Sequence, residues 1–258
     1  MRRKVPGGII GMVHLKPLPG SPSFSGDIDA VERDAMADAR NLISGGVDAI
    51  LIENFGDVPF QKNVDAVTIS AMTRIVRSIK ELSDLPLGVN VLRNDAKAAL
   101  AIATATGAQF IRINVHIGAM ITDQGLIEGK AAETLRYREM LGSDVAIMAD
   151  VGVKHAMPFE EGWTLEQEAK DAWNRGLADA LIVSGQGTGG VTKVEDLMRV
   201  RGVVPDAPII VGSGANMETI PLQNMASAWI VGTALKQDGD VVKAVELERV
   251  KEIVSLTK

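Results

Sequence analysis

The chain has 258 residues, of which 46% are hydrophobic, and it carries a formal net charge of −6 without a single cysteine. This length and apolar content suffice for one large core, and the negative charge argues against a general nucleic-acid surface. The absence of cysteine excludes disulfides, thiol catalysis and thiolate metal sites, and it fits the cytoplasmic location that we expect.

Short apolar runs alternate with helix-like segments along the whole chain, and no linker interrupts them. Strands are predicted at residues 9–15, 49–54, 87–92, 110–115, 145–151, 180–184, 209–212 and 228–232. Helices are predicted at 28–44, 65–82, 94–106, 130–141, 165–175, 194–200, 217–224 and 240–256. Regular alternation of this kind is typical of a parallel sheet flanked by helices. We therefore predict an α/β fold, a single-domain (β/α)8 TIM barrel over residues 1–258. No apolar stretch is long enough to form a transmembrane segment.

The connections after the strands are longer than those before them. Residues 16–27, 55–64, 116–129 and 152–164 form long strand-to-helix loops, whereas the helix-to-strand links are short. Binding sites of barrels lie at the C-terminal ends of the strands, where such loops gather. The loop lengths thus place the expected site at that face.

Two glycine turns near the C-terminus predict a phosphate site. Gly212, Ser213 and Gly214 follow the strand at 209–212, and Gly232 and Thr233 end the last strand. Glycine lets the backbone approach an anion, and free N–H groups at a helix start point toward it; Asn216 is the expected helix cap. Paired turns after the last two strands are typical of barrels that bind phosphate.

A third glycine-rich turn, residues 184–190, follows the sixth predicted strand. Gly185 and Thr188 belong to this turn, where amides and a hydroxyl are suited to an anion or to sugar hydroxyls. The turn lacks the Gly-Lys-Ser/Thr of a P-loop and the glycine spacing of a dinucleotide-binding turn. On its own it is equally consistent with a flexible loop.

Polar side chains gather where the predicted strands end. Alternation along each strand turns one set of side chains toward the barrel axis. The inward polar set at the C-terminal ends comprises His14, Glu53, Asn90, Arg112, Asn114, His116, Asp150 and Ser184. Burying so many polar groups is costly unless they pair or bind a ligand. Two interpretations stay open for each member: an internal network, with Arg112 paired to Glu53 or Asp150, or a ligand site.

Roles follow from the residue types. Asp150, His116 and Glu53 are the candidates for proton transfer. The candidates for substrate binding are His14, Asn90, Arg112, Asn114, Lys154, Ser184 and Thr188. Lys154 lies in a loop, where it either meets a phosphate or is solvated. A metal site from Glu53, His116 and Asp150 ranks below a metal-free site because no ligand spacing specifies it, and no other cofactor is required; a divalent metal stays open.

Motifs spread over nearly the whole chain resemble those of the BtpA family. They are GMVHLKPLPGSP at 11–22, ENFGDVPF at 53–60, NVLRND at 90–95, IRIN at 111–114, ADV at 149–151, VSG at 183–185 with TG at 188–189, VGSG at 211–214 and IVGT at 230–233. The first is the most specific, and the motifs coincide with the strand-end residues. The resemblance implies two roles: photosystem I biogenesis at thylakoid membranes for the founding member, and similarity to sugar-phosphate barrel enzymes for SgcQ-like members.

Three functional hypotheses follow. The leading one is an enzyme of a small phosphorylated metabolite, a sugar phosphate or nucleoside phosphate, with lyase, isomerase and hydrolase chemistry all open. The second is a non-catalytic assembly factor that binds proteins at a membrane surface as a peripheral protein. The third is a sensor of a phosphorylated ligand. We expect a homo-oligomer, because soluble assemblies are commonly symmetric.

Overall fold

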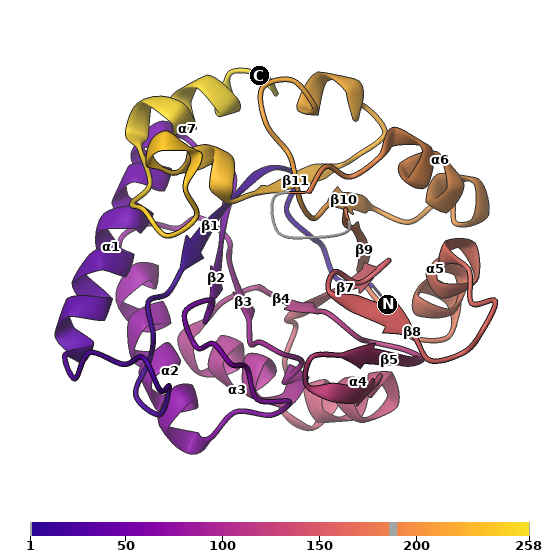
Figure 1. Ribbon diagram of the computed structural model, residues 1–258, viewed down its shortest axis with the longest axis horizontal. Coiled ribbons are helices and arrows are strands. Elements are labelled where there is room, and N and C mark those ends of the chain that lie inside the picture. Colours follow the sequence, from indigo (N-terminus) through magenta and orange to yellow (C-terminus); the bar gives the residue numbers. More distant parts are fainter. Residues whose placement is uncertain (1, 186–189, 258) are drawn as a thin grey trace.

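Eight parallel strands close into a barrel in the computed structural model, which describes residues 2–185 and 190–257 (Figure 1). Strand β1 (Gly8–His14) pairs with β2 (Ala49–Glu53) on one side and with β11 (Ala228–Val231) on the other. The ring continues through β3 (Leu87–Asn90), β4 (Phe110–Ile113), β7 (Ala146–Val151), β9 (Ala180–Val183) and β10 (Ile209–Val211). The predicted TIM barrel is confirmed, and each predicted strand overlaps an observed one.

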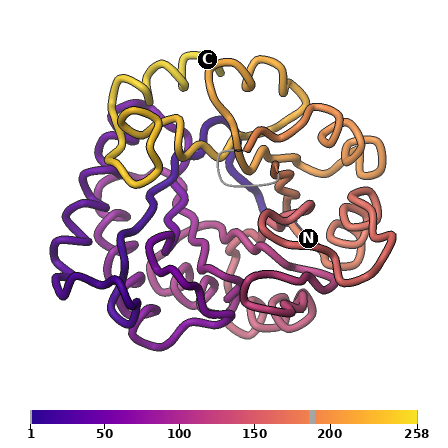
Figure 2. Tube along the Cα trace, viewed as in Figure 1, coloured from indigo at the N-terminus to yellow at the C-terminus, as the bar shows by residue number. Residues whose placement is uncertain are grey.

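An outer layer of helices covers the barrel. It comprises α1 (Ile28–Gly45), α2 (Ala66–Lys80), α3 (Ala96–Thr106), α4 (Ala131–Met140), α5 (Leu165–Asn174), α6 (Val194–Val203) and α7 (Leu247–Val254). Local sequence sets their ends: the Asp27 side chain accepts a hydrogen bond from the Ala30 N–H to start α1, and Gly46 ends it in the left-handed conformation. The chain winds once round the barrel axis, so α7 packs beside α1 (Figure 2).

Two predicted helices are wrong in type or extent. The segment predicted as a helix at 217–224 forms only the 3₁₀ turn η1 (Ile220–Leu222), because Pro221 lacks an N–H and the Asn216 side chain accepts from Glu218 and Thr219 in a tight turn. The helix predicted from 240 starts at Leu247. Before it, the 3₁₀ turns η2 (Thr233–Leu235) and η3 (Gln237–Gly239) lead into a segment pinned to α1.

Asp38 of α1 holds the segment between η2 and α7 in place through hydrogen bonds. Its carboxylate accepts hydrogen bonds from the Lys236 ammonium at 2.6 Å and from the Val245 N–H at 2.7 Å, and Lys236 is almost fully buried. A buried lysine requires a partner of this kind. The pair therefore fixes the segment that follows the last barrel strand.

Side chains of the barrel strands alternate between two cores, as the predicted inward and outward faces require. The outward set packs under the helices, and the inward set fills the barrel with residues such as Met12, Leu51, Phe110 and Met148. A Cβ atom at Gly88 would overlap the Phe110 ring, so this glycine makes room for the largest inward side chain. The next inward positions toward the C-terminal ends are polar and line the site.

Two of the long loops form a small sheet that sequence reasoning did not predict. Strands β5 (Ala119–Thr122), β6 (Gly125–Glu128) and β8 (Ala156–Pro158) pair in the antiparallel order β6-β5-β8. Met120 and Ile127 are buried on one face together with Val115 and Val153. Ile121 is opposite both Leu126 and Met157 on the neighbouring strands, and all three are exposed.

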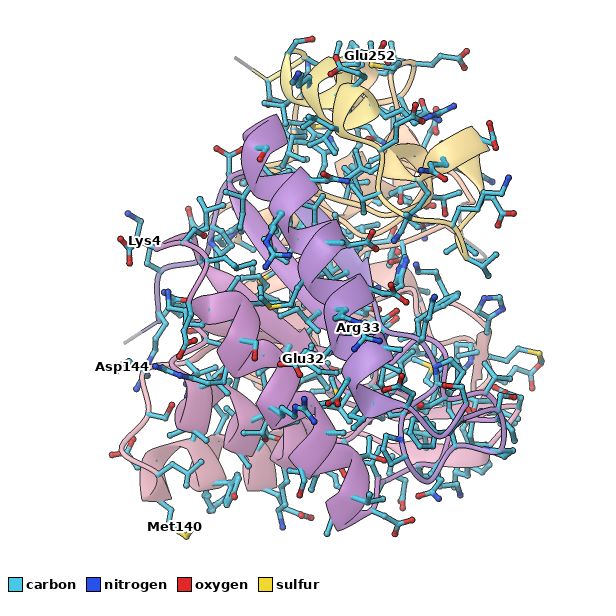
Figure 3. The ribbon with its side chains drawn as sticks, turned by 90° about the vertical axis from the view of Figure 1, so that its left-hand side faces the viewer. Lys4, Glu32, Arg33, Met140, Asp144 and Glu252 are labelled. Atoms are coloured by element: carbon cyan, nitrogen blue, oxygen red, sulfur yellow. The ribbon has the colours of Figure 1, made fainter. Side chains whose placement is uncertain are left out.

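The opposite end of the barrel is closed by the first residues of the chain. The Arg2 guanidinium stacks on the Trp173 ring at 3.4 Å and donates to the carbonyl of Ala178. Figure 3 shows Lys4 and Asp144 together at this end of the molecule. The cavity described next is lined by residues at the other end, where the strands lead into the long loops.

Candidate active site

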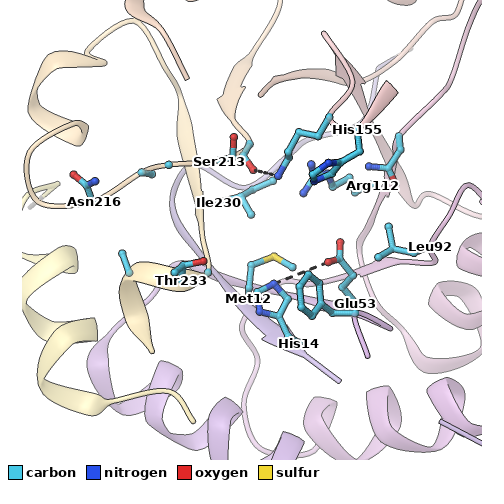
Figure 4. Close-up of a pocket in the computed structure, with 18 of the residues that line it drawn as sticks. Met12, His14, Glu53, Leu92, Arg112, His155, Ser213, Asn216, Ile230 and Thr233 are labelled. Carbon is cyan, nitrogen blue, oxygen red and sulfur yellow. Dashed lines mark hydrogen bonds and ion pairs between the residues drawn. The ribbon is translucent and has the colours of Figure 1, made fainter. Parts of the chain in front are cut away.

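A cavity of about 380 Å³ lies at the C-terminal ends of the barrel strands (Figure 4). Several side chains that the sequence singled out line it, namely His14, Glu53, Arg112, Asn114 and Lys154. The turns after β10 and β11 line it as well. In Figure 4, Thr233 and Asn216 lie across the cavity from Arg112 and Leu92. The cavity thus has a side made of backbone turns and a side made of charged and apolar side chains.

The two turns present unused backbone donors. Among the described residues, the N–H groups of Gly214, Thr233 and Ala234 donate to no protein acceptor. Gly214 has a φ of 67°, which favours glycine, and a Cβ atom there would overlap the backbone of Val191. A Cβ at Gly232 would come within 2.8 Å of the His14 ring. Free N–H groups at such turns form an anion-binding concavity.

Lys154 lies beside the first of these turns. Its Nζ atom donates to the Gly212 carbonyl at 3.3 Å. Burial, and secondarily the nearby charge of Arg112, lowers the pKa of Lys154 to about 8. The ammonium is therefore charged below that pH and is placed next to the free amides.

Lys154 gives the site a testable pH dependence. Below pH 8 the charged ammonium attracts an anion, and this attraction is lost as the pH rises through the pKa of about 8. The second pKa of a phosphate monoester is about 6, so the ligand itself stays dianionic above pH 7. We expect affinity for ribose 5-phosphate, measured by calorimetry, to fall about tenfold from pH 7 to pH 9.5.

Two variants isolate the lysine as the cause. Lys154→Arg stays charged at both pH values and should keep its affinity, whereas Lys154→Gln should bind weakly at both. An equal loss of affinity with pH in wild type and Lys154→Gln would assign the dependence to another group.

Asp150 is occupied by a buried ion pair. Its two oxygens accept from Arg112 Nε at 2.8 Å and Nη2 at 2.9 Å, and Asn114 Nδ2 donates to the same carboxylate at 3.0 Å. Asn90 Nδ2 in turn donates a hydrogen bond to Asn114 Oδ1 at 3.3 Å. Burial lowers the pKa of Arg112, but the charge and hydrogen bonds of Asp150, together with the charge of Glu53, outweigh burial and raise that pKa above its ordinary value. Asp150 therefore holds Arg112 in place and charged, with little capacity left for a substrate proton.

Glu53 is the carboxyl group that faces the cavity with its oxygens unused. No described residue donates a hydrogen bond to it, and its Oε1 lies 4.0 Å from Nε2 of the His14 ring. Burial raises the pKa of Glu53, and Arg112 and Lys154 oppose the shift. A buried carboxyl with a raised pKa is suited to proton transfer near neutral pH.

His14 stays neutral between the two sides of the cavity. Burial, followed by the charge of Lys236, lowers its pKa to about 3. Its ring lies against Phe55 with 4.6 Å between centroids. Its buried Nδ1 has no hydrogen-bond partner among the residues that the structure describes. A neutral imidazole in this position offers a donor or acceptor to a ligand rather than a charge.

The cavity is cationic although the chain is acidic. Arg93, Arg112, Lys154 and Arg249 line it together with one carboxyl group, that of Glu53, in a chain of net charge −6. Arg93 is buried, and its Nη2 donates to the Lys154 carbonyl at 2.6 Å, which fixes the loop that carries the lysine. This balance favours an anionic ligand.

Comparison with known proteins assigns the family. The family model described as the BtpA family matches residues 6–258. The chain belongs to the BtpA family. It is 48% identical over 95% of its length to the photosystem I biogenesis protein BtpA of Synechocystis, covering 86% of that protein. It is 47% identical to an uncharacterised protein of Thermococcus kodakarensis, over 97% of this chain and 95% of the other.

Solved structures that resemble this BtpA-family chain are barrels of low sequence identity. A structure described as native KDPGal matches with a TM-score of 0.59 at 14% identity, over 99% of this chain and 95% of the other. N-(5′-phosphoribosyl)anthranilate isomerase of Pyrococcus furiosus matches with a TM-score of 0.57 at 13% identity, over 97% and 98%. At sequence identities this low, the similarity shows a shared fold and nothing about function. Within the described residues, no helix is long and apolar enough to cross a membrane.

Five of the predicted site residues that the structure describes lie outside the cavity lining: Asn90 and Asp150, which are bonded to lining residues, and His116, Ser184 and Gly185. His116 is buried with its Nε2 2.8 Å from the Gly176 carbonyl, outside the cavity lining. Ser184 and Gly185 line a separate hollow beside β8, where the Gly185 N–H donates to Ser213 Oγ. Thr188 lies outside the described residues. Ser213 lines the cavity, but its hydroxyl is used within the turn, where it donates to the Gly190 carbonyl.

The carboxylate–histidine metal site that the sequence left open, below a metal-free site, does not assemble among the described residues. In residues 2–185 and 190–257, no three histidine, aspartate or glutamate side chains come together as metal ligands. His116 faces Gly176, and Asp150 is bonded to Arg112 and Asn114, so neither lies with Glu53 as a ligand set.

Sequence reasoning missed several residues that line the cavity: Phe55, Phe60, Arg93, His155 and Arg249. Arg93 directly follows the predicted strand at 87–92, so its position at a strand end was a usable signal. Phe55 and Phe60 lie in a long loop, where no regular spacing of apolar residues indicates which side chains face a cavity. Arg249 comes from α7 and reaches the cavity only through the closure of the barrel.

Proposed function

We propose that this protein is an enzyme that binds a small phosphorylated metabolite in the cavity at the C-terminal face of the barrel. The observation that carries the proposal is the set of unused N–H groups on two adjacent turns, those of Gly214, Thr233 and Ala234. Lys154, Arg112 and Arg93 add positive charge to the same cavity. Amides and cations together are the usual means of holding a phosphate.

The chemistry we assign is proton transfer by Glu53. This carboxyl is buried, faces the ligand space and is free of internal hydrogen bonds within the described chain, whereas Asp150 is fully engaged. Arg112 and Asn114 would orient the substrate and stabilise negative charge that develops on it. Lyase, isomerase and hydrolase reactions each include proton transfers that a carboxyl group in this place can perform.

The similar structures support the proposal at the level of the fold. The name of the isomerase from Pyrococcus furiosus states that its substrate carries a phosphoribosyl group. That barrel and this one share their architecture, and barrels commonly hold phosphate at the turns after strands seven and eight. Here β10 and β11 are the seventh and eighth strands of the barrel in chain order.

A thermal-shift screen against inorganic phosphate, sugar phosphates and nucleotides, with and without Mg²⁺, tests the proposal. A ligand present at 100 times its Kd stabilises the folded state by about 2.7 kcal/mol, a shift of several degrees in Tm. Thr233→Asp should weaken binding at least tenfold, because a carboxylate replaces a hydroxyl beside the free amides. Thr233 is preferable to Gly214, where any side chain strains the backbone.

Ser25→Asp is the matched control, since it adds the same charge at an exposed loop position outside the cavity. Equal binding by Thr233→Asp and Ser25→Asp would place the phosphate elsewhere on the protein.

A non-catalytic assembly factor is the second candidate. Two observations favour it: the name of the Synechocystis relative, and the exposed apolar side chains of Ile121, Leu126 and Met157 on the small sheet. A screen in which no phosphorylated ligand raises the Tm would favour this candidate. A ligand that binds without being converted would favour a sensor.

The expected cytoplasmic location and homo-oligomeric state stay predictions.

A further inference from the structure

Two phenylalanines of one loop face the cavity instead of the core. Phe55 and Phe60 line the cavity, and in the described part of the chain neither ring belongs to a core cluster or packs against one. Aromatic residues make up only 3% of this sequence, and Phe110, by contrast, fills the barrel interior. Apolar rings left facing a cavity are best explained by a ligand that covers them.

The loop that carries these rings is held in place from both sides. The Gly56 N–H donates to the Leu15 carbonyl at 2.9 Å, and the Gln61 carbonyl accepts from the Arg93 N–H at 2.9 Å. The Asn54 side chain also bonds Leu92 through both of its polar atoms. The rings are therefore positioned before a ligand arrives, which lowers the entropic cost of binding.

Phe60 lies on the side of the cavity away from the turns after β10 and β11, whereas Phe55 stacks on His14 in the middle of the cavity, near Gly232. Gln61 is bonded to Arg93, which brings the adjacent Phe60 to the Leu92 side, and Figure 4 shows Leu92 opposite Thr233 and Asn216. Between the two sides stand Glu53 and His14, whose buried Nδ1 is unpartnered within the described residues. A cavity of about 380 Å³ is in the range of sites, roughly 300–1,000 Å³, that enclose drug-sized ligands. It exceeds the space that a phosphate with a short carbon chain needs.

We propose that the ligand is a phosphorylated pentose that carries a planar ring, as a nucleoside 5′-monophosphate does. The phosphate binds at the turns after β10 and β11, the ring packs against Phe60, and the sugar lies beside Glu53, His14 and Phe55. This inference rests on the proposed function, because it takes the phosphate end as given. It adds the chemical class of the group at the end of the ligand opposite the phosphate.

Calorimetric titration of the intact protein with inorganic phosphate, ribose 5-phosphate, and purine and pyrimidine nucleoside 5′-monophosphates tests the inference. We expect at least one nucleotide to bind about tenfold more tightly than ribose 5-phosphate, the size of one ring-stacking contact. Phe60→Ala should remove that tenfold preference and leave the affinity for ribose 5-phosphate unchanged. The exposed Phe159, which lies outside the cavity, supplies the control Phe159→Ala, which should retain both affinities.

The outcomes separate the two claims. Ribose 5-phosphate binding as tightly as every nucleotide, or a preference that survives in Phe60→Ala, would overturn the ring assignment while leaving the phosphate site intact. Absence of binding by all four ligand types would overturn the proposed function itself. Folding of Phe60→Ala is checked by its Tm, which should stay close to that of the wild type because the ring does not pack on the core.

Discussion

Arg112→Met is expected to lower the free energy of unfolding by about 3–5 kcal/mol, because it leaves the buried carboxylate of Asp150 without its partner. Both side chains are almost completely buried, so water cannot replace the lost guanidinium. Urea denaturation followed by circular dichroism measures the change, provided that the slope with denaturant is unchanged.

The double variant Arg112→Met, Asp150→Leu tests the cause of this loss. Replacing both charges by apolar side chains of similar size removes the uncompensated charge, so the double variant should recover most of the stability. A loss below 1 kcal/mol in Arg112→Met, or no recovery in the double variant, would mean that the pair does not hold the site together as described.

Glu53→Gln is expected to reduce turnover by about 10²–10⁴-fold, the usual contribution of a positioned acid or base. Glutamine keeps the shape of the side chain but can neither give up nor accept the proton. Affinity for the phosphorylated ligand should change little, because the phosphate contacts lie at the turns after β10 and β11. Steady-state kinetics on the ligand that the thermal-shift screen identifies, together with calorimetry, separate the two effects.

The pH profile provides a second readout for Glu53. Because burial raises the pKa of Glu53, the limb of the wild-type profile that reports Glu53 should lie above the ordinary range of a glutamate. It is the acidic limb if Glu53 accepts the proton and the basic limb if Glu53 donates it, and it should vanish from the residual activity of Glu53→Gln. Turnover in Glu53→Gln within threefold of the wild type would exclude the proton-transfer role.

Much of the architecture could be predicted because each strand and helix is marked by the local spacing of its apolar residues and by the residues at its ends. Strands such as Ile209–Val211 are short β-branched runs, and helices such as α1 start at a capping aspartate and stop at a glycine. Inward and outward positions follow from alternation alone, which is why Glu53, Arg112 and Asp150 were all expected to face the barrel axis. The buried Arg112–Asp150 pair confirms the internal-pair interpretation for these two residues, and Arg112 pairs with Asp150 instead of Glu53.

The remaining features depend on contacts between distant segments. The small sheet of β5, β6 and β8 joins residues from two loops about 35 positions apart, and no local signal marks that pairing. The helix predicted from residue 240 starts late because Asp38, some two hundred positions earlier, binds Lys236 and Val245. His116 continues the inward alternation of its strand in sequence, yet β4 ends at Ile113 and the chain turns toward Gly176.

The most direct test of the central claim is a crystal structure of the protein grown with ribose 5-phosphate. We expect the phosphate group within about 3 Å of the N–H groups of Gly214, Thr233 and Ala234, with the Lys154 ammonium beside it. A phosphate bound elsewhere on the molecule, with these amides contacting only solvent, would mean that the two turns are not the phosphate site.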